Sequence, residues 1–389
     1  MAGREFYAQN IRFFPGLVES GDLTASPSSD IWILRIYRRM DIVIACPTAR
    51  HVVIHPDTAY VLKFSLIPFT KRKFSSICFR CGWQRRLKVL DQSELPVDLP
   101  ALWKESYMAI LEETAQLVKE KLGSDFDAVT IEKIVIGIFF TGVKLSTGTG
   151  GICFTPIKNI PQAVCCPSSA GRIFNPTTVG QTRAGDVLEA LSSREPIKTA
   201  TAIATLNALS ATCCQRGLQD NYTIQMNLDA QDAVRMGADQ SVAVIGAFVP
   251  VLKYLKQRGG TWWVIEQDPA TLRPEEMAHF VSAERSREII AKADVLIITG
   301  VTLLNHTLEE ILQATGPHAE IAVIGPTASL LPEALFQRGV RVVGGVWVQK
   351  PDELLDVLAA GGSGYHFFDD LAARIVIENK AWGNSAGNI

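Results

Sequence analysis

The sequence predicts an α/β protein in which a doubly wound parallel sheet, with helices on both faces, follows a smaller α+β domain. The last part of the chain alternates short uncharged apolar runs with amphipathic helical stretches. Strands that are apolar throughout belong to parallel sheets buried on both faces. The middle part combines a helix with strand-like runs around a glycine-rich turn. With 389 residues, the chain also exceeds the usual size of one hydrophobic core, so we expect more than one domain.

Residues 1–107 differ in charge and pattern from the rest. Residues 1–100 carry 14 Lys/Arg against 9 Asp/Glu, whereas the remainder carries 24 against 31. The apolar runs here show no sustained helical or strand period, so we interpret residues 1–107 as a start-site extension or a poorly ordered segment, with Met108 as a natural start. Nucleic-acid binding by KRKFSSICFRCGWQRRLK, or zinc binding by Cys78-x-x-Cys81, is the competing interpretation. A zinc site is disfavoured because no second ligand pair lies nearby.

Residues 108–235 predict the small α+β domain. YMAILEETAQLVKEKLG, residues 107–123, has apolar residues at helical spacing and Gly123 at its end. The apolar runs at 130–146 and 152–156 flank TGTGG and predict a hairpin. TATAIATLNALSATCC, residues 199–214, is too short and too rich in Ala and Thr for a membrane span, so it predicts a buried helix.

Two features of this domain are candidates for a site. Lys144 stands near the end of the first strand-like run, where its charge must face solvent or contact an anionic ligand in an interdomain cleft. Cys165 and Cys166 lie in a non-helical stretch, and thiolates are the ligands that soft metals prefer. Simple burial is the competing interpretation for both cysteines, as it is for Cys213 and Cys214 in the predicted helix.

Residues 236–389 predict the parallel sheet. Five apolar runs, at 241–248, 261–268, 294–301, 320–327 and 340–348, are separated by helical stretches at 251–260, 283–293, 307–316, 330–339 and 351–362. This alternation is typical of a Rossmann-like domain, in which ligands bind outside the carboxyl ends of the strands.

The loops after the first two strands bear on nucleotide binding. Gly246 precedes a helix that has Pro250 in its first turn. Glu266 follows Gly246 at the spacing where dinucleotide-binding proteins place an acid on the ribose hydroxyls. Phe248 and Val251 replace the second and third glycines of GxGxxG, so NAD is disfavoured. Glu266 remains a candidate for holding another hydroxyl-bearing ligand, or is a solvent-facing acid.

The loop after the third strand holds further candidates. Thr307-x-x-Glu310 fits a capping box, in which the Thr hydroxyl accepts an amide hydrogen bond and the Glu carboxylate reaches back. The residues before the helix, at the expected binding edge, are thus left without a capping role. For His306, the interpretation as a metal ligand competes with that of a packed or solvated side chain. The candidates in this loop are Thr299, Gly300, Thr302, Asn305 and His306.

Several motifs together resemble the putative heavy-metal chelation family. They are FFTGVKLSTGTGGICFTP, AVCCPSSA, VIGAFVP, WVIE, ITGVTLLNHTLEEIL, VIGPT and GGVWV. The resemblance extends from Met108 to the end of the chain. It implies a small domain resembling the N-terminal domain of enolase, then a Rossmann-like domain, with a site between them. By resemblance, Lys144, Cys165 and Cys166 face the site from the small domain, and Glu266, Thr299, Thr302, Asn305 and His306 face it from the large one.

Composition restricts the setting of the protein. A net charge of −2 and a pI near 6.3 favour neither nucleic acid nor a membrane surface as partner. The first residues lack the apolar core of a signal peptide. The eight cysteines do not form a disulfide spacing pattern, so we expect a reducing cytoplasm. A homo-oligomer is compatible with the sequence.

These observations favour a protein whose cleft binds a transition or heavy metal ion, or a metal-chelating small molecule. Cys165 or Cys166 would supply soft donors, and Glu266 and His306 would supply oxygen and nitrogen donors. The rival hypothesis is an enzyme that uses a nucleotide-like or S-adenosylmethionine-like ligand held by Glu266 and the helix after Gly246. A third reading is a non-catalytic interaction module. No nucleophile, base and acid can be grouped by spacing, so the sequence assigns no reaction.

Overall fold

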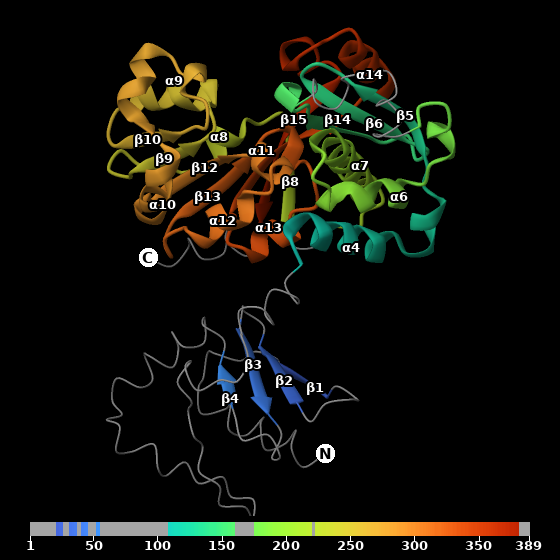
Figure 1. Cartoon of the computed structure of the whole chain (residues 1–389), viewed down its shortest axis with the longest axis horizontal. Coiled ribbons are helices and arrows are strands. Elements are labelled where there is room, and N and C mark those ends of the chain that lie inside the picture. The colour runs from blue at the N-terminus through green and yellow to red at the C-terminus, as the bar shows by residue number, and fades with distance from the viewer. Residues whose placement is uncertain are drawn as a thin grey trace, which may run out of the picture. The chain divides into compact units, whose positions relative to one another are not determined.

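The computed structural model describes residues 108–159, 175–219 and 222–380, together with the backbone of four strands before residue 55 (Figure 1). The chain separates into two compact units, Met1–Tyr107 and Met108–Ile389. In the first unit an antiparallel sheet follows chain order: β1 (Gly21–Ala25), β2 (Ile31–Ile36), β3 (Met40–Ala45) and β4 (Val52–Ile54). Cys78 and Cys81 lie outside the described residues. The interpretation of residues 1–107 as an extension stays a prediction.

An eight-stranded sheet is the main feature of the second unit, in the order β11-β10-β9-β12-β13-β14-β15-β8. The first six strands are parallel, and their order along the chain is that of a Rossmann sheet. The strands are β8 (Tyr222–Met226), β9 (Val242–Ile245), β10 (Trp262–Ile265), β11 (Phe280–Val281), β12 (Val295–Thr299), β13 (Glu320–Ile324), β14 (Val342–Val348) and β15 (Ala372–Asn379). The predicted fold class is confirmed.

Helices cover both faces of this sheet, because alternate strand residues point to opposite sides. On one face Val244 and Ile297 pack in the same core as Leu252. On the other, Ile245 and Ile298 share a larger core with apolar residues of the helices at 283–292, 308–313 and 333–337. The predicted helices are all present, as α9 (Val249–Arg258), α10 (Ala283–Lys292), α12 (Leu308–Gln313), α13 (Glu333–Gln337) and α14 (Pro351–Ala359).

A three-stranded antiparallel sheet stands beside the large one, formed by β5 (Ile131–Ile136), β6 (Phe140–Leu145) and β7 (Gly150–Phe154). The helix α7 (Pro196–Gln215) lies directly on β7, since a Cβ on Gly151 would collide with the backbone of Ala204 and Ala208. The opposite face is covered by α14, whose Leu355 and Leu358 lie against Gly142. No helix within the described ranges is both long and apolar enough to cross a membrane.

The remaining elements are short, apart from the predicted first helix α4 (Ile110–Leu122), which ends at Gly123 with φ 57°. Three further helices are α6 (Ala184–Leu188), α8 (Ala230–Ala233) and α11 (Val301–Leu304). The 3₁₀ turns are η3 (Gly123–Ala128), η4 (Ile157–Asn159), η6 (Val179–Gln181), η7 (Glu189–Ser192), η8 (Pro269–Thr271), η9 (Pro274–His279), η10 (Pro326–Ala328) and η11 (Gly364–His366).

The structure differs from the sequence expectation in how the chain is shared between the sheets. The apolar run at 130–146 forms two strands, because the chain reverses where Gly137 N donates to Phe140 O at 3.0 Å. The strands β8 and β15 were not predicted, and they add an antiparallel end to the large sheet. The strand β8 belongs to the large sheet although it precedes residue 236. The helix α14 covers the small sheet although it comes after residue 236. The domain boundary at residues 235 and 236 stays a prediction.

Candidate functional site

The strands β9 and β12 end side by side at the point where the strand order reverses. Gly246 follows β9 with φ 99°, and a Cβ on it would lie 2.9 Å from Thr299 Cγ2 at the end of β12. Ligands of doubly wound sheets bind outside this reversal point. The structure therefore brings two predicted site residues, Gly246 and Thr299, into contact at the expected edge.

Glu266 follows β10 at the same edge, and its carboxylate is surrounded by backbone donors. Its Oε2 accepts from Ala247 N at 2.9 Å, and its Oε1 accepts from Gln267 N at 2.7 Å and Asp268 N at 3.3 Å. A carboxylate offers about four lone-pair positions, so little acceptor capacity remains. Glu266 thus ties the loop after β9 to the loop after β10.

Phe248 stands at the position of the second glycine of GxGxxG, where a dinucleotide-binding loop brings its backbone close to the pyrophosphate. It precedes α9, and its ring Cζ is 3.8 Å from the position of a Cβ on Gly325, which follows β13. The ring therefore extends toward the strand ends beyond β9. Together with the Glu266 carboxylate on Ala247 N, this geometry argues against an anionic phosphate in the loop.

The end of the β6–β7 hairpin at Phe154 is hydrogen-bonded to η10, which directly follows β13. Thr327 Oγ1, in η10, accepts a hydrogen bond from Phe154 N at 3.1 Å. The Asn207 side chain on α7 donates from Nδ2 to Ile152 O at 2.9 Å, Thr327 O at 3.2 Å and Pro326 O at 3.3 Å. Asn207 and Thr327 are both buried, and their bonds join the two sheets next to the candidate site.

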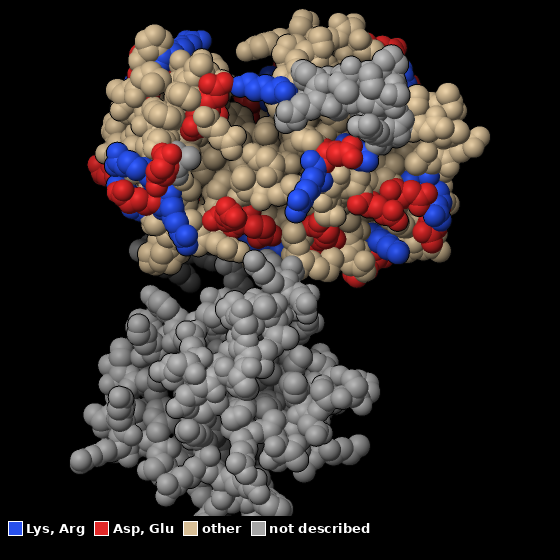
Figure 2. Space-filling view, viewed as in Figure 1, with Lys and Arg blue, Asp and Glu red and all other residues tan. Residues whose placement is uncertain are grey.

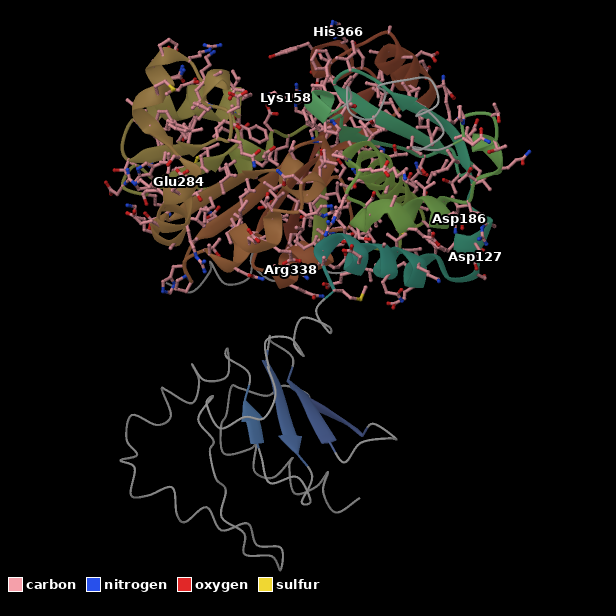
Figure 3. All side chains as sticks on the ribbon, viewed as in Figure 1. Asp127, Lys158, Asp186, Glu284, Arg338 and His366 are labelled. Carbon is pink, nitrogen blue, oxygen red and sulfur yellow. The ribbon has the colours of Figure 1, made fainter. Side chains whose placement is uncertain are left out.

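An ion pair at the surface joins the segment after β7 to the loop after β10. Lys158 lies in η4 (Figure 3), and its Nζ is 2.6 Å from Oδ2 of Asp268, two residues after Glu266. The hydrogen bond to Asp268 raises the pKa of Lys158, and the same bond, with one from Ala270 N, lowers the pKa of Asp268. The negative charge of Glu266 also raises the pKa of Lys158. Lys158, Glu266 and Asp268 thus form a charged group at this edge.

The loop after β12 turns back toward η10. A Cβ on Gly300 would lie 3.1 Å from Ala328 N, so this glycine allows the loop to pack closely. Thr302 is buried, and its Oγ1 donates to Thr299 O at 2.7 Å. In this structure Thr302 stabilises the turn that begins α11.

Asn305 and His306 form a turn between α11 and α12. Thr307 N donates to Thr302 O at 3.0 Å and His306 N donates to Leu303 O at 3.4 Å, the bonds of a Schellman motif. His306 takes the left-handed position of this motif, with φ 58°, where glycine is usual. Its side chain is exposed. The backbone position of His306 is therefore explained by the turn.

The predicted capping box at Thr307 and Glu310 is wrong. The Thr307 side chain makes no cap hydrogen bond to α12. Its Oγ1 instead donates to the side-chain Oδ1 of Asn305 at 2.7 Å, because Asn305, the C-cap of α11, lies only two residues before Thr307. Asn305 is accordingly engaged with Thr307 within its own turn.

Lys144 lies away from this group, in ion pairs with Asp352 at 2.8 Å and Glu132 at 3.0 Å. The hydrogen bonds to Asp352 and Glu132 raise its pKa. In the hairpin register Lys144 pairs with Gly150, at the opposite end from the Phe140–Phe154 pair that adjoins η10. Its contact with an anionic ligand stays a prediction.

Cys165 and Cys166 lie outside the described residues. Among the cysteines that are described, burial raises the pKa of Cys153 and of Cys213 to about 12, and it also raises the pKa of Cys214. These three side chains are therefore protonated at neutral pH. Within the described ranges, no three His, Cys, Asp or Glu side chains converge in a group that could hold a metal ion.

The structure thus assembles only part of the predicted set. Gly246, Glu266, Thr299 and Gly300 share the carboxyl edge of the sheet, with Thr302 behind Thr299. Sequence reasoning missed Asn207, Lys158 and Asp268, whose partners are more than 50 residues away along the chain. The Gly325-Pro326-Thr327 motif was the available signal for the contact with the hairpin.

Comparisons with known proteins agree with this architecture. Residues 119–210 and residues 229–377 each match a family described as "putative heavy-metal chelation". An uncharacterized protein of Methanocaldococcus jannaschii is 25% identical over 170 residues, which are 42% of this chain and 60% of that protein. The matched region therefore spans less than two thirds of that relative.

Two solved structures have a similar fold. A protein of unknown function from Pyrococcus horikoshii, from the family matched by residues 229–377, aligns with a TM-score of 0.54 and 21% identity over 69% of this chain and 100% of its own. A second member of that family, from Desulfitobacterium hafniense, aligns with a TM-score of 0.52 and 15% identity, over 69% of this chain and 98% of its own. At these identities the likeness concerns the fold.

Proposed function

Because this chain belongs to the family described as putative heavy-metal chelation, we propose that it binds a transition or heavy metal ion at the carboxyl edge of its parallel sheet. The ion binds directly or as a complex with a chelating small molecule. The proposal assigns soft donors to Cys165 or Cys166 and harder donors to Glu266 and His306. The residues proposed to line the ligand at this edge are Gly246, Thr299, Gly300, Thr302 and Asn305.

The observation that carries this proposal is where the hairpin end is attached. Phe154 is bonded to Thr327, and Lys158 is paired with Asp268, so the chain reaches Asn159 beside the loop of Glu266. Cys165 follows Asn159 by six residues, a length that spans up to about 20 Å. The chain length therefore permits Cys165 and Cys166 to reach this edge.

The donor chemistry of the described residues limits what they bind without help. Glu266 already accepts three backbone hydrogen bonds, and the buried cysteines are protonated. The described residues thus lack a closed cage of the kind that structural zinc requires. Thiolates from Cys165 and Cys166, or donors from a chelating ligand, would complete the coordination.

Equilibrium dialysis with metal analysis tests these assignments. The full chain is dialysed against Zn²⁺, Cu²⁺ and Cd²⁺, and the bound metal is compared with that of Cys165→Ala/Cys166→Ala and of His306→Ala. We expect at least a tenfold loss of affinity in the cysteine variant and a smaller loss in His306→Ala. Binding should weaken as the pH falls, because thiolate and imidazole ligands must lose their protons.

Matched controls separate the proposed ligands from other donors. His318→Ala removes another exposed histidine, and Cys78→Ala/Cys81→Ala removes the CxxC pair of the first unit. Both controls should bind metal as the unchanged protein does. Unchanged stoichiometry and affinity in the Cys165/Cys166 and His306 variants would reject the assigned ligands.

The alternative function, an enzyme with a nucleotide-like or S-adenosylmethionine-like ligand, is distinguished by thermal-shift screening. A ligand that binds only the native state raises the unfolding temperature by mass action. Stabilisation by S-adenosylmethionine or a nucleotide, without stabilisation by metals or their chelates, would replace metal binding with this alternative. The Glu266 carboxylate on Ala247 N disfavours the phosphate-bearing members of that class.

A further inference from the structure

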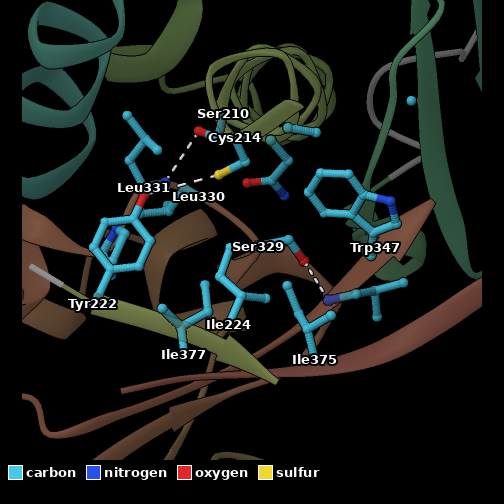
Figure 4. A pocket seen from close by; sticks show the side chains of 15 residues that line it. Ser210, Cys214, Tyr222, Ile224, Ser329, Leu330, Leu331, Trp347, Ile375 and Ile377 are labelled. Atoms are coloured by element: carbon cyan, nitrogen blue, oxygen red, sulfur yellow. Dashed lines mark hydrogen bonds between the residues drawn. The ribbon is translucent and has the colours of Figure 1, made fainter. Parts of the chain in front are cut away.

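A small cavity lies between α7 and the antiparallel end of the large sheet (Figure 4). From α7 it is lined by Asn207, Ser210 and Cys214, whose spacing of three and four residues places them on one face of the helix. From the sheet, Trp347 and Ile375 contribute apolar side chains to the wall. The cavity is separate from the charged group at Lys158 and Asp268.

One polar atom of the lining lacks a partner. Asn207 is 2% exposed, and its Oδ1 accepts no hydrogen bond from any described residue. The orientation of the amide is determined by Nδ2, which donates to three carbonyl oxygens from β7 and η10. Reversing the amide would set Oδ1 against those carbonyl oxygens. Because a buried acceptor without a hydrogen bond destabilises the fold, a donor in the cavity is favoured.

The lining excludes a charged occupant. It contains no carboxylate, and its two titratable groups, Cys214 and Tyr222, are in contact at 3.8 Å. Burial raises the pKa of each, so both remain protonated and neutral. A metal cation would find no negative charge here to offset its loss of hydration. The occupant that suits Asn207 is therefore a neutral hydrogen-bond donor.

Size then selects among neutral donors. The cavity volume is about 20 Å³. A water molecule needs at least about 10–15 Å³ of such space, whereas a cavity that binds benzene is several times larger. Ser210 offers a second partner, because its Oγ accepts from Leu331 N at 3.1 Å and keeps its own hydrogen for donation.

We propose that this cavity binds one ordered water molecule, which donates to Asn207 Oδ1 and accepts from the Ser210 hydroxyl. The water completes the hydrogen bonds of the side chain that joins α7, β7 and η10. It is thus part of the connection between the two sheets, behind the candidate site. The proposal does not depend on metal binding.

A crystal structure of the full chain at about 1.5 Å resolution tests the proposal directly. We expect one spherical density peak within hydrogen-bond distance of both Asn207 Oδ1 and Ser210 Oγ. An ordered Asn207 with no peak at Oδ1, a peak with anomalous metal signal, or density for a larger molecule would overturn the proposal.

Water relaxation dispersion provides a second test in solution, because it counts long-lived internal waters. Val346→Ile adds a methylene group to the cavity wall, and we expect the count to fall by one. Val348→Ile makes the same change on the same strand, at a residue that does not line the cavity, and should leave the count unchanged. Equal counts in the two variants would contradict the proposal.

Discussion

At the scale of single residues, the predicted site residues divide into those with a structural role and those that remain available. Gly246 is required by its backbone, and Thr302 and Asn305 bond within their own turns. Glu266 holds two loops together. His306 has a constrained backbone and an exposed side chain, so a ligand role for its imidazole is compatible with its position.

Gly246→Ala should destabilise the second unit by about 1–3 kcal/mol, since alanine is strained at a φ of 99° and meets Thr299 Cγ2. Urea unfolding measures the change. Thr299→Ser removes that methyl group and keeps the hydroxyl, so the double variant should recover part of the loss. Additive effects of Gly246→Ala and Thr299→Ser would show that the contact has no energetic weight.

His306 can be tested for its two roles separately. His306→Gly relieves the left-handed strain and should be about 0.5–1 kcal/mol more stable than His306→Ala, as measured by urea unfolding. If the imidazole is a metal ligand, both variants should lose metal affinity equally. Retained affinity in both would confine His306 to the turn.

At the scale of elements, short contacts between distant segments position the candidate site. The β6–β7 hairpin reaches the carboxyl edge of β13 through Phe154, Thr327 and Asn207. The pair of Lys158 and Asp268 adds a contact at the surface, where Figure 2 shows both signs of charge interspersed. Such an exposed pair contributes little stability and is weakened by salt. The hydrogen bonds of the buried residues Asn207 and Thr327 therefore hold these elements together.

The pKa of Asp268 should lie below its ordinary value of about 3.9, because Lys158 and Ala270 N donate to it. Its contribution to stability is then complete above about pH 4 and is lost as the pH falls through the lower folded pKa. Carbon-detected NMR titration measures this value. Lys158→Ala should raise the pKa toward 3.9; an unchanged pKa would show that the ion pair does not form in solution.

At the scale of the whole chain, the second unit begins with an anchored helix. Glu309 Oε1 accepts from Ile110 N at 3.0 Å at the start of α4. Arg338, 7% exposed, donates to Met108 O at 2.9 Å and pairs with Glu113 at 2.8 Å and Glu309 at 3.1 Å. These contacts lie wholly within the second unit.

A chain that starts at Met108 should therefore fold with the stability of the second unit in the full chain. Differential scanning calorimetry should give the same main unfolding transition for both. Arg338→Ala should lower the free energy of unfolding by about 1–3 kcal/mol in either chain, because it removes the cation that pairs with the partly buried carboxylates of Glu309 and Glu113. A shorter chain that fails to fold would show that residues 1–107 are part of the fold.

The sequence by itself determined the parallel sheet, its helices and the edge at which Gly246, Glu266 and Thr299 meet. These features follow from local periodicity and from strand order, which apolar runs and turn residues reveal. The tertiary structure decided what each side chain does there. The bonds of Asn207 and the pairing of Lys144 with Asp352 join residues far apart along the chain, and the Ala247 N donor reaches Glu266 from the loop after another strand. Such contacts depend on how the sheets pack, which no local pattern encodes.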